Sequence, residues 1–437
     1  MFISSQGLIK LKEFLKQKVF FGNEPTPELI AILLVYFVQG ILGLGSLAVS
    51  FFLKDELGMS PAEVSAMFGI VVIPWMIKPI FGFISDGVPI LGYRRRPYMI
   101  FSGILGAFSW VALANWVHTP LAATGAIAMS SLSIAIGDVI VDSLVVERVQ
   151  KESLSTTGAL QSLCWAASAF GGLITAYFSG YLLEHLSNQT VFLITATFPL
   201  IISFVPWLIA EEKVSIGIDF DNFKYQVKQV QQAVTKKSIL LPTAFILIWQ
   251  ATPSSESAFF YFSTNELGFQ PEFLGRIRLV TSIAALVGVW LFQRFLKSVP
   301  FRKIFGWCTV ISAVIGMTTL LLVTHTNRAL GIDDHWFSLG DSLVLAAMGK
   351  IAFMPVLVLA ARLCPLGVEA TLFALLMSIN NLGGVISHEG GALLTHWLGV
   401  TETNFDNLWL LVVITNLSTL LPLPFLNLLP TANAQTE

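Results

Sequence analysis

The stretch from Pro74 to Pro97, PWMIKPIFGFISDGVPILGYRRRP, decides the fold class of this chain. Its first part is apolar apart from Lys78, as in a membrane helix. Its last part carries three consecutive arginines, Arg94, Arg95 and Arg96, and basic clusters of this kind mark the cytoplasmic end of a membrane span. The stretch therefore predicts a membrane helix that meets the cytoplasm.

The composition of the whole chain agrees with a membrane protein. Hydrophobic residues make up 55% of the 437 residues, and charged residues make up only 12%. Soluble domains have about 25% charged residues, so a polytopic membrane protein surrounded by lipid is expected. The formal net charge of -2 shows no basic excess of the kind that nucleic-acid binding requires, and no nucleic-acid partner is expected.

Twelve apolar runs are long enough, at about 20 residues each, to cross a hydrocarbon core. In the first half they are Leu29 to Phe52, Val64 to Phe83, Tyr98 to Val117, Leu121 to Val145, Gly158 to Leu182 and Val191 to Ile209. In the second half they are Ile239 to Phe262, Phe273 to Phe295, Ile304 to Val323, Leu339 to Arg362, Ala370 to Leu398 and Leu408 to Leu428. An all-α polytopic protein with six helices on each side of a polar break is predicted.

An internal repeat relates the two halves. The segment DELGMSPAEV from Asp55 recurs as NELGFQPEFL from Asn265, 210 residues later. The run from Gly158 to Leu186 aligns without gaps on the run from Ala370 to Leu398, including a Gly-Gly pair in each. The fifth and eleventh helices are therefore expected to occupy equivalent places in two six-helix repeats.

The predicted organisation follows from these spans and from the positions of the basic residues. Most of the 25 lysines and arginines lie on one side if both termini are cytoplasmic. The expected segments are an amphipathic cytoplasmic lead-in at 1–28, a six-helix bundle at 29–210, a cytoplasmic linker with an amphipathic helix at 211–238, a second bundle at 239–428 and a tail at 429–437.

Ionisable side chains inside the spans are the functional candidates, since each costs about 2.5 to 3.5 kcal/mol on insertion scales. Asp138 and Asp142 lie four residues apart on one face of the fourth span. Lys78 lies at a similar depth in the second span, which makes an ion pair with either carboxylate expected. Such a pair either fixes the packing of the first half or opens and closes with a central cavity.

The second half carries a charge of opposite sign at a corresponding place. Lys350 aligns on Asp138 at the repeat offset of 212 residues, so an anionic or amphoteric ligand would meet both charges. A flat heteroaromatic ligand could stack on tryptophans within the spans, although core or lipid-facing packing is the better explanation of any single tryptophan. The remaining substrate-binding candidates are Trp75, Trp165, Trp249 and Asn380.

Two further carboxylates and two arginines lie in or near the second-half spans. Glu256 follows Pro253, where a kinked or unwound helix is expected. Glu256 and Glu389, with Asp138 and Asp142, are the candidates for proton coupling because burial raises the pKa of a carboxyl group. Arg276 and Arg278 either attract an anion into an outer vestibule or extend to the lipid headgroups.

Motifs for other chemistries are missing from the sequence. It has no G-x-x-x-x-G-K-[ST] phosphate loop, no serine nucleophile elbow and no histidine cluster spaced for a metal. The three cysteines, at positions 164, 308 and 364, show no ligand-like spacing. An enzyme is therefore not expected, nor is a cofactor or a bound metal ion.

The loop after the second span carries a recognisable pattern. Gly82, Asp86, Gly92 and the arginines at 94–96 resemble the G-x-x-x-D…G-x-R-R motif of major facilitator superfamily transporters. The resemblance implies twelve helices in two repeats, a substrate site between the halves, and a gating loop formed by Gly82, Asp86, Arg94, Arg95 and Arg96. The gap between Asp86 and Gly92 is longer than in the general motif, which weakens the transfer of loop mechanics.

Three segments together narrow the resemblance. PWMIKPIFGFISD, YRRRP and DVIVDSLVVERV are similar to those of the folate-biopterin transporter family, found in cyanobacteria, plastids and protozoan parasites. The resemblance implies folates and pterins as cargo, moved by alternating access with proton symport. The amino-pyrimidine edge of a pterin would meet Asp138 or Asp142, and the glutamate tail of folate would meet Lys350 or Lys78.

Two alternatives stay open. One is a facilitator-superfamily permease for another small anionic or amphoteric solute, and the other is a non-transporting assembly protein of photosynthetic complexes. The compact loops and the missing transit-like leader favour the inner membrane of a bacterium, such as a cyanobacterium, over the plastid envelope. A monomer is expected.

Overall fold

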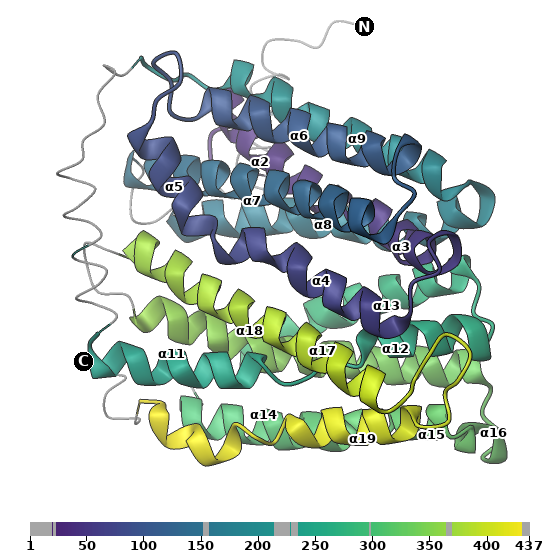
Figure 1. Ribbon diagram of the computed structural model, residues 1–437. Helices are drawn as coiled ribbons and strands as arrows, with labels where there is room; N and C mark the ends of the chain where they lie inside the picture. The colour runs from purple at the N-terminus through teal and green to yellow at the C-terminus, as the bar shows by residue number, and fades with distance from the viewer. Residues whose placement is uncertain are drawn as a thin grey trace, which may run out of the picture.

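Helices dominate the computed structural model of the chain (Figure 1). The structure describes residues 20, 23–151, 157–213, 228, 235–296, 299–363 and 369–430. Within these ranges the β structure is an isolated bridge between Ile90 and Tyr93. The predicted all-α class is therefore confirmed.

The first half contains the helices that correspond to the first six predicted spans. They are α2 (Pro27–Ile41), α3 (Leu44–Phe51), the π-helical turn η2 (Phe52–Glu56), α4 (Pro61–Met76), α5 (Lys78–Gly87), α6 (Arg96–Asn115), α7 (Pro120–Lys151), α8 (Thr157–His185), α9 (Asn188–Phe204) and the 3-10 helix η3 (Val205–Leu208).

The second half follows the same plan. It contains α11 (Lys237–Gln250), α12 (Glu256–Tyr261), the π-helical turn η4 (Phe262–Glu266), α13 (Pro271–Leu291), the π-helical turn η5 (Phe292–Leu296), α14 (Phe301–Gly316), α15 (Thr319–Val323), α16 (Thr326–Ala329), α17 (Asp334–Leu363), α18 (Glu369–Trp397), α19 (Leu408–Ser418) and the 3-10 helix η6 (Leu423–Leu428).

Ten helical segments of the described residues are long and apolar enough to cross a membrane. The seventh predicted span is helical but broken at residues 251–255, between α11 and α12, as expected from Pro253. The eleventh predicted span forms the 29-residue helix α18, which carries Asn380, Asn381 and Glu389 among its apolar residues. The count of twelve membrane spans stays a prediction.

The repeat is visible in the backbone at residue level. The turns η2 and η4 are both π-helical, and each is followed by a glycine in the left-handed region, Gly58 with φ 60° and Gly268 with φ 69°. The N–H of Leu57 donates to Phe52 O, and that of Leu267 donates to Phe262 O, both at 3.0 Å. The aligned sequences thus form the same turn in each half.

Each half is held together by its own helix contacts, and the halves meet along two helix pairs. Within the first half α6 packs against α7 and α9, and within the second α13 and α14 pack against α17. Between the halves α4 packs along α18, and α8 packs along α13. In Figure 1 the helices of the first half lie above those of the second, with α4 and α18 between them.

One end of the molecule is sealed by contacts between the halves. We call it the sealed end; it carries the loops 57–60, 267–270 and 398–407. There the hydroxyl of Tyr261 donates to Met59 O, and Lys54 Nζ donates to Asn265 Oδ1 at 2.8 Å. Further along α18, Ser65 Oγ donates to His388 O at 2.9 Å. The inter-half hydrogen bond nearest the opposite end joins Asn381 Nδ2 to Trp75 O at 3.2 Å.

Parts of the predicted organisation lie outside the described residues. They include most of the lead-in at 1–28, most of the linker at 211–238 and all but the first residues of the tail at 429–437. The predicted amphipathic helices of the lead-in and the linker, and the boundaries of the two bundles, stay predictions.

Candidate functional site

Lys78 lies immediately after a break in the second span. The sequence predicts one continuous helix there, but α4 ends at Met76 and α5 begins at Lys78. The reason is Pro79, which has no N–H to donate to Trp75 O one turn earlier. That free carbonyl accepts the hydrogen bond from Asn381 of α18 instead. The break thus places Lys78 at a helix start in mid-span, next to the contact between the halves.

Lys78 lies between the two carboxylates of α7. Its Nζ forms an ion pair with Oδ2 of Asp138 and a second with Oδ2 of Asp142, the latter at 3.0 Å. The Lys78 and Asp138 side chains are 19% and 14% exposed, whereas Asp142 is 48% exposed. Nζ also lies 5.8 Å from the ring centroid of Trp75. Asp138 is therefore the enclosed member of the pair, and Asp142 is the open one.

Two residues of α2, neither of them predicted from the sequence, complete this cluster. The hydroxyl of Tyr36 donates to Asp142 Oδ1 at 2.6 Å, and Gln39 Nε2 donates to Asp138 Oδ1 at 3.0 Å. Both are polar side chains three residues apart in an apolar helix. This spacing is the sequence feature that could have identified them. Each carboxylate of the N-half cluster, defined here as Tyr36, Gln39, Lys78, Asp138 and Asp142, thus has a cationic and a neutral partner.

The N-half cluster carries one excess negative charge when all its groups are ionised, because two carboxylates face one ammonium. An uncompensated charge within a membrane span is unfavourable. One additional proton, or a cationic or hydrogen-bond-donating ligand, would compensate it. The arrangement is therefore suited to bind a proton or a donor-rich ligand edge beside Lys78.

Lys350 of α17 lies in the second half, apart from the cluster. It is exposed and lines a cavity of about 490 Å³ together with Trp249, Gln250, Ala285 and Phe353. Its Nζ lies 5.5 Å from the ring centroid of Phe353. Among the described residues Lys350 has no acidic partner within ion-pair distance. Its charge is therefore available to an anionic ligand that enters the cavity.

The remaining substrate-binding candidates are placed differently. Trp75 lies beside Lys78, and Trp249 lines the cavity with Lys350 while its ring contacts Phe305 edge-on at 5.9 Å. Trp165 of α8 is 61% exposed. Asn380 is only 8% exposed, and it shares a helix face with Gly383, whose Cα packs against Gln250 of α11. Its neighbour Asn381 is the asparagine that contacts the other half.

The two second-half carboxylates lie near the contact between the halves. Glu256 starts α12, directly after the unwound residues 251–255, and is exposed. The unwound segment is held by Ser387 of α18, which donates to Thr252 O at 2.6 Å. Glu389 packs on α4 so closely that a methyl group at Gly69 would lie 2.6 Å from its Oε1. Their role in proton coupling stays a prediction.

The two arginines of α13 behave oppositely. Arg276 pairs with Glu272 at 2.6 Å, and its side chain is 58% exposed. Arg278 turns inward and donates to the hydroxyl of Ser46 on α3 of the other half. The two arginines thus point to different surroundings, and their predicted roles in a vestibule or at the headgroups stay predictions.

The predicted gating loop is held within the first half. The carboxylate of Glu211 accepts hydrogen bonds from the backbone N–H groups of Arg94, Arg95 and Arg96 at 2.6, 2.9 and 3.1 Å. Gly92 has φ 84°, so the tight turn before the arginines requires glycine there. Gly82 lies in α5 against Val139, 3.5 Å from where a Cβ would be, and the side chain of Asp86 lies outside the described residues.

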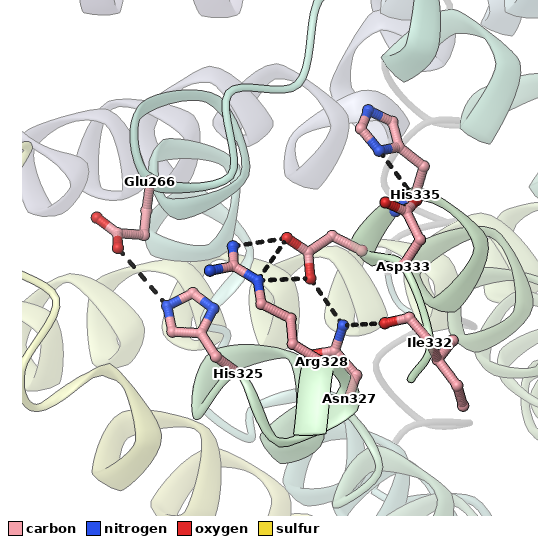
Figure 2. Close-up of polar contacts among 8 residues, drawn as sticks. Glu266, His325, Asn327, Arg328, Ile332, Asp333 and His335 are labelled. Atoms are coloured by element: carbon pink, nitrogen blue, oxygen red, sulfur yellow. Dashed lines mark hydrogen bonds and ion pairs between the residues drawn. The ribbon is translucent and has the colours of Figure 1, made fainter. Parts of the chain in front are cut away.

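A second polar cluster lies at the sealed end of the second half (Figure 2). Arg328 forms an ion pair with Asp334 at 2.7 Å, and hydrogen bonding to that carboxylate raises the pKa of the Arg328 guanidinium. His325 Nε2 lies 3.6 Å from Glu266 Oε1. A cavity of about 580 Å³ opens beside His325 and Glu266. The ion pair of Arg328 with Asp334 lies within the connection between α15 and α17, and His325 links this connection to η4, so we assign these contacts a structural role.

In the described parts of the chain, no three His, Cys, Asp or Glu side chains are grouped so that they could hold a metal ion. Cys164 and Cys308 are free and buried, and Cys364 lies outside the described residues. The N-half cluster and the Lys350 cavity are therefore the candidate site.

Comparisons with known proteins were made for sequence and for structure. The model of the BT1 family matches residues 39–437. The chain is 64% identical over 427 residues to the folate-biopterin transporter of Synechocystis, covering 98% of this chain and 86% of that protein. It is 31% identical over 401 residues to folate transporter 2 of Plasmodium falciparum, covering 92% and 88%.

Solved structures show the fold. The nucleoside transporter NupG superposes with a TM-score of 0.70 at 13% identity, covering 92% of this chain and all of that one. The D-xylose-proton symporter superposes with a TM-score of 0.66 at 13% identity, covering 92% and 98%. The predicted major facilitator fold is therefore confirmed.

Proposed function

Because the chain belongs to the BT1 family, as the match over residues 39–437 shows, we propose that it transports folates and pterins across a membrane by alternating access. The observation that carries this proposal is the arrangement of charges. The N-half cluster has an excess negative charge, and the cavity of the second half presents Lys350, which has no acidic partner among the described residues. An amphoteric cargo can satisfy both.

The chemistry of folates and pterins fits the two regions. The amino-pyrimidine edge of a pterin has adjacent N–H donors, which match the two oxygens of a carboxylate such as Asp138 or Asp142. The glutamate tail of folate is anionic and pairs with Lys350. Trp75 and Trp249, one beside each charge, offer aromatic faces on which the flat rings can stack.

Proton symport follows from the same charges. Lys78 forms ion pairs with both carboxylates. A pterin edge that donates hydrogen bonds to Asp138 therefore competes with Lys78 for this carboxylate. A proton taken up by the cluster removes the excess negative charge and loosens the hold of one carboxylate on Lys78. Cargo and proton then bind to one cluster, which is the minimal arrangement for coupling their movement. The two carboxylates act as a pair and share the proton.

The sealed end is assigned to the outside, so the structure represents the inward-facing state. This assignment rests on the positive-inside rule, because the basic run at 94–96 lies at the opposite end of the bundle. Both termini are then cytoplasmic, the protein resides in the inner membrane of a bacterium, and one monomer contains the complete path between its halves.

The proposal is tested by uptake of labelled folate into proteoliposomes, with and without an imposed pH gradient. Wild-type protein is expected to take up folate faster with the gradient, in competition with pterins and not with p-aminobenzoate or glutamate alone. Asp138→Asn should abolish uptake while the protein remains in the membrane. Asp333→Asn is the matched control, since Asp333 is an exposed carboxylate at the sealed end.

Other outcomes separate the alternatives. Unchanged uptake by Asp138→Asn would remove Asp138 from binding and coupling. Uptake of a different solute that folate does not compete with would indicate another permease. Absence of any uptake, together with copurification of pigment proteins, would indicate an assembly factor.

A further inference from the structure

Arg278 is a charged side chain within a membrane span. Neither the N-half cluster nor Lys350 accounts for a charge at this position. It lies on α13, is half-buried, and donates to the hydroxyl of Ser46 on α3 across the contact between the halves. Ser46 in turn donates to Gly43 O at 2.7 Å. A membrane arginine normally has a partner or a task, and here the neutral Ser46 is the partner.

Most of the hydrogen-bonding capacity of Arg278 remains free. A guanidinium has five N–H donors, and Ser46 receives one of them. Glu256 is the acidic residue whose charge acts on Arg278, but it is not within ion-pair distance in the described structure. The guanidinium is thus a planar donor group suited to a carboxylate, and the described residues place no carboxylate within ion-pair distance of it.

Arg278 lies on the face of α13 that also lines the cavity of Lys350. Ala285, which lines that cavity, lies seven residues further along α13 and therefore on the same helix face. Two helical turns separate the two residues, about 10 Å along the axis. The second half therefore presents cations at two depths, Lys350 within the cavity and Arg278 towards the sealed end.

The neighbouring arginine provides an internal contrast. Arg276 is two residues away, and at this spacing it points to a different side of the helix. It is 58% exposed and pairs with Glu272. The inward placement of Arg278 is therefore a property of its position and not of every arginine in this segment.

We propose that Arg278 is a second cation for the dicarboxylate tail of the cargo and thereby selects folates over tail-free pterins. This inference rests on the proposed function. Arg278 meets the tail when the sealed end opens and Ser46 moves away with the first half. When that end closes again, Ser46 takes back its hydrogen bond, and the exchange of a carboxylate for a neutral hydroxyl favours release of the tail.

The test compares uptake of folate with uptake of biopterin, which lacks the glutamate tail, in the same proteoliposomes. Arg278→Gln should raise the KM for folate tenfold or more and change that for biopterin less than twofold. Arg278→Lys should be intermediate, because it keeps the charge and loses the planar fork. Arg276→Gln is the matched control and should leave both cargoes unchanged. Ser46→Ala should slow folate turnover without raising the KM for folate, because Ser46 acts on release of the tail and not on its binding.

Other results would overturn the proposal. They are an equal loss of both cargoes in Arg278→Gln at normal membrane content, no change in either cargo, or a rise in the KM for folate in Ser46→Ala equal to that in Arg278→Gln. If Arg278→Gln is not recovered in the membrane, the ratio measured for Arg278→Lys decides. A wild-type protein that takes up neither cargo would instead refute the proposed function, so the two failures are distinguishable.

Discussion

In the first half of the molecule Lys78 lies between Asp138 and Asp142, whereas in the second half Lys350, at the repeat-equivalent position of Asp138, lies over Phe353. The two halves share their backbone plan down to the π-helical turns η2 and η4. The same scaffold thus carries an ion-paired cluster with one excess negative charge on one side and, among the described residues, a cation without an acidic partner on the other. The two repeats therefore share their backbone architecture and differ in the charges that they carry.

The physical consequence of this difference concerns stability. Breaking a buried ion pair leaves an uncompensated charge, so the first half depends on its cluster for folding as well as for binding. Lys350 is exposed to a cavity and has no acidic partner among the described residues, so its removal leaves nothing unpaired. Four sets of substitutions test this contrast between the halves, in order of decreasing expected effect.

Lys78→Gln should have the largest effect. It leaves Asp138 and Asp142 facing each other without a cation, and we expect a loss of about 3 kcal/mol in stability and loss of folate uptake. Thermal unfolding of the purified protein and proteoliposome uptake measure these two effects. Lys303→Gln, at an exposed lysine of α14, is the control.

A second substitution separates stability from function in this cluster. Adding Asp142→Asn to Lys78→Gln removes one of the opposed carboxylates, so thermal stability should partly recover while uptake stays absent. Normal stability of Lys78→Gln alone would show that the cluster does not support the fold, and the contrast between the halves would fail.

Lys350→Gln should weaken folate uptake without changing the melting temperature. A hydrogen bond to a charged group contributes about 1.5 to 3 kcal/mol, which corresponds to an increase in KM of about 10- to 100-fold. Lys350→Arg keeps the charge and should retain most uptake. A loss of stability as large as that of Lys78→Gln would contradict the assignment of Lys350 as an unpaired cation.

Glycine substitutions distinguish contacts between the halves from contacts within one half. A methyl group at Gly180 would lie 2.4 Å from Pro271 O of the other half, and one at Gly40 would lie 2.1 Å from Ser168 O of the same half. Gly180→Ala should therefore destabilise the sealed state by about 1 to 3 kcal/mol, and Gly40→Ala should destabilise the first bundle by a similar amount.

Labelling and unfolding report these two effects separately. A cysteine introduced at Met59, in a background without Cys164, Cys308 and Cys364, should become more reactive in Gly180→Ala at unchanged thermal stability. Gly40→Ala should lower the melting temperature without this gain in reactivity. The reverse pattern would mean that α8 and α13 do not form the seal.

Glu211→Gln should have the smallest effect. Arg96 of the first half donates to Ile209 O, and Arg302 of the second donates to Leu429 O at 2.6 Å, so both halves tie a helix start to a helix end. The carboxylate of Glu211 on the N-terminus of α6 adds to this tie, and its charge contributes about 0.5 to 1 kcal/mol. A small drop in melting temperature with unchanged uptake is expected, compared with Glu212→Gln, an exposed neighbour. A larger drop would indicate that the loop supports more than the α6 terminus.

The fold could be predicted from the sequence in more detail than the site could. Apolar run length predicted the helices, and the aligned segments from Asp55 and Asn265 predicted the repeat that η2 and η4 confirm. The break at Pro253 was predicted because proline removes a helical hydrogen bond. The break at Ile77 was missed, although Pro79 acts in the same way, because the apolar run continues through it.

Within the site, the predicted ion pair of Lys78 with the two carboxylates is present, since equal depth in neighbouring spans follows from counting residues. Tyr36 and Gln39 were missed because a tyrosine and a glutamine in an apolar helix carry no charge that demands a partner. The functional roles of these residues stay predictions until uptake is measured.

The sequence by itself determined the membrane class, the two repeats and the residues whose charges need compensation, because hydropathy, repeat spacing and charge are properties of the chain read in order. The tertiary structure was needed to show which charges meet and which end is sealed. It was also needed to show that Arg278 turns inward while Arg276 turns outward. These features depend on side chains 60 or more residues apart, whose contact is set by how the helices rotate and pack against one another.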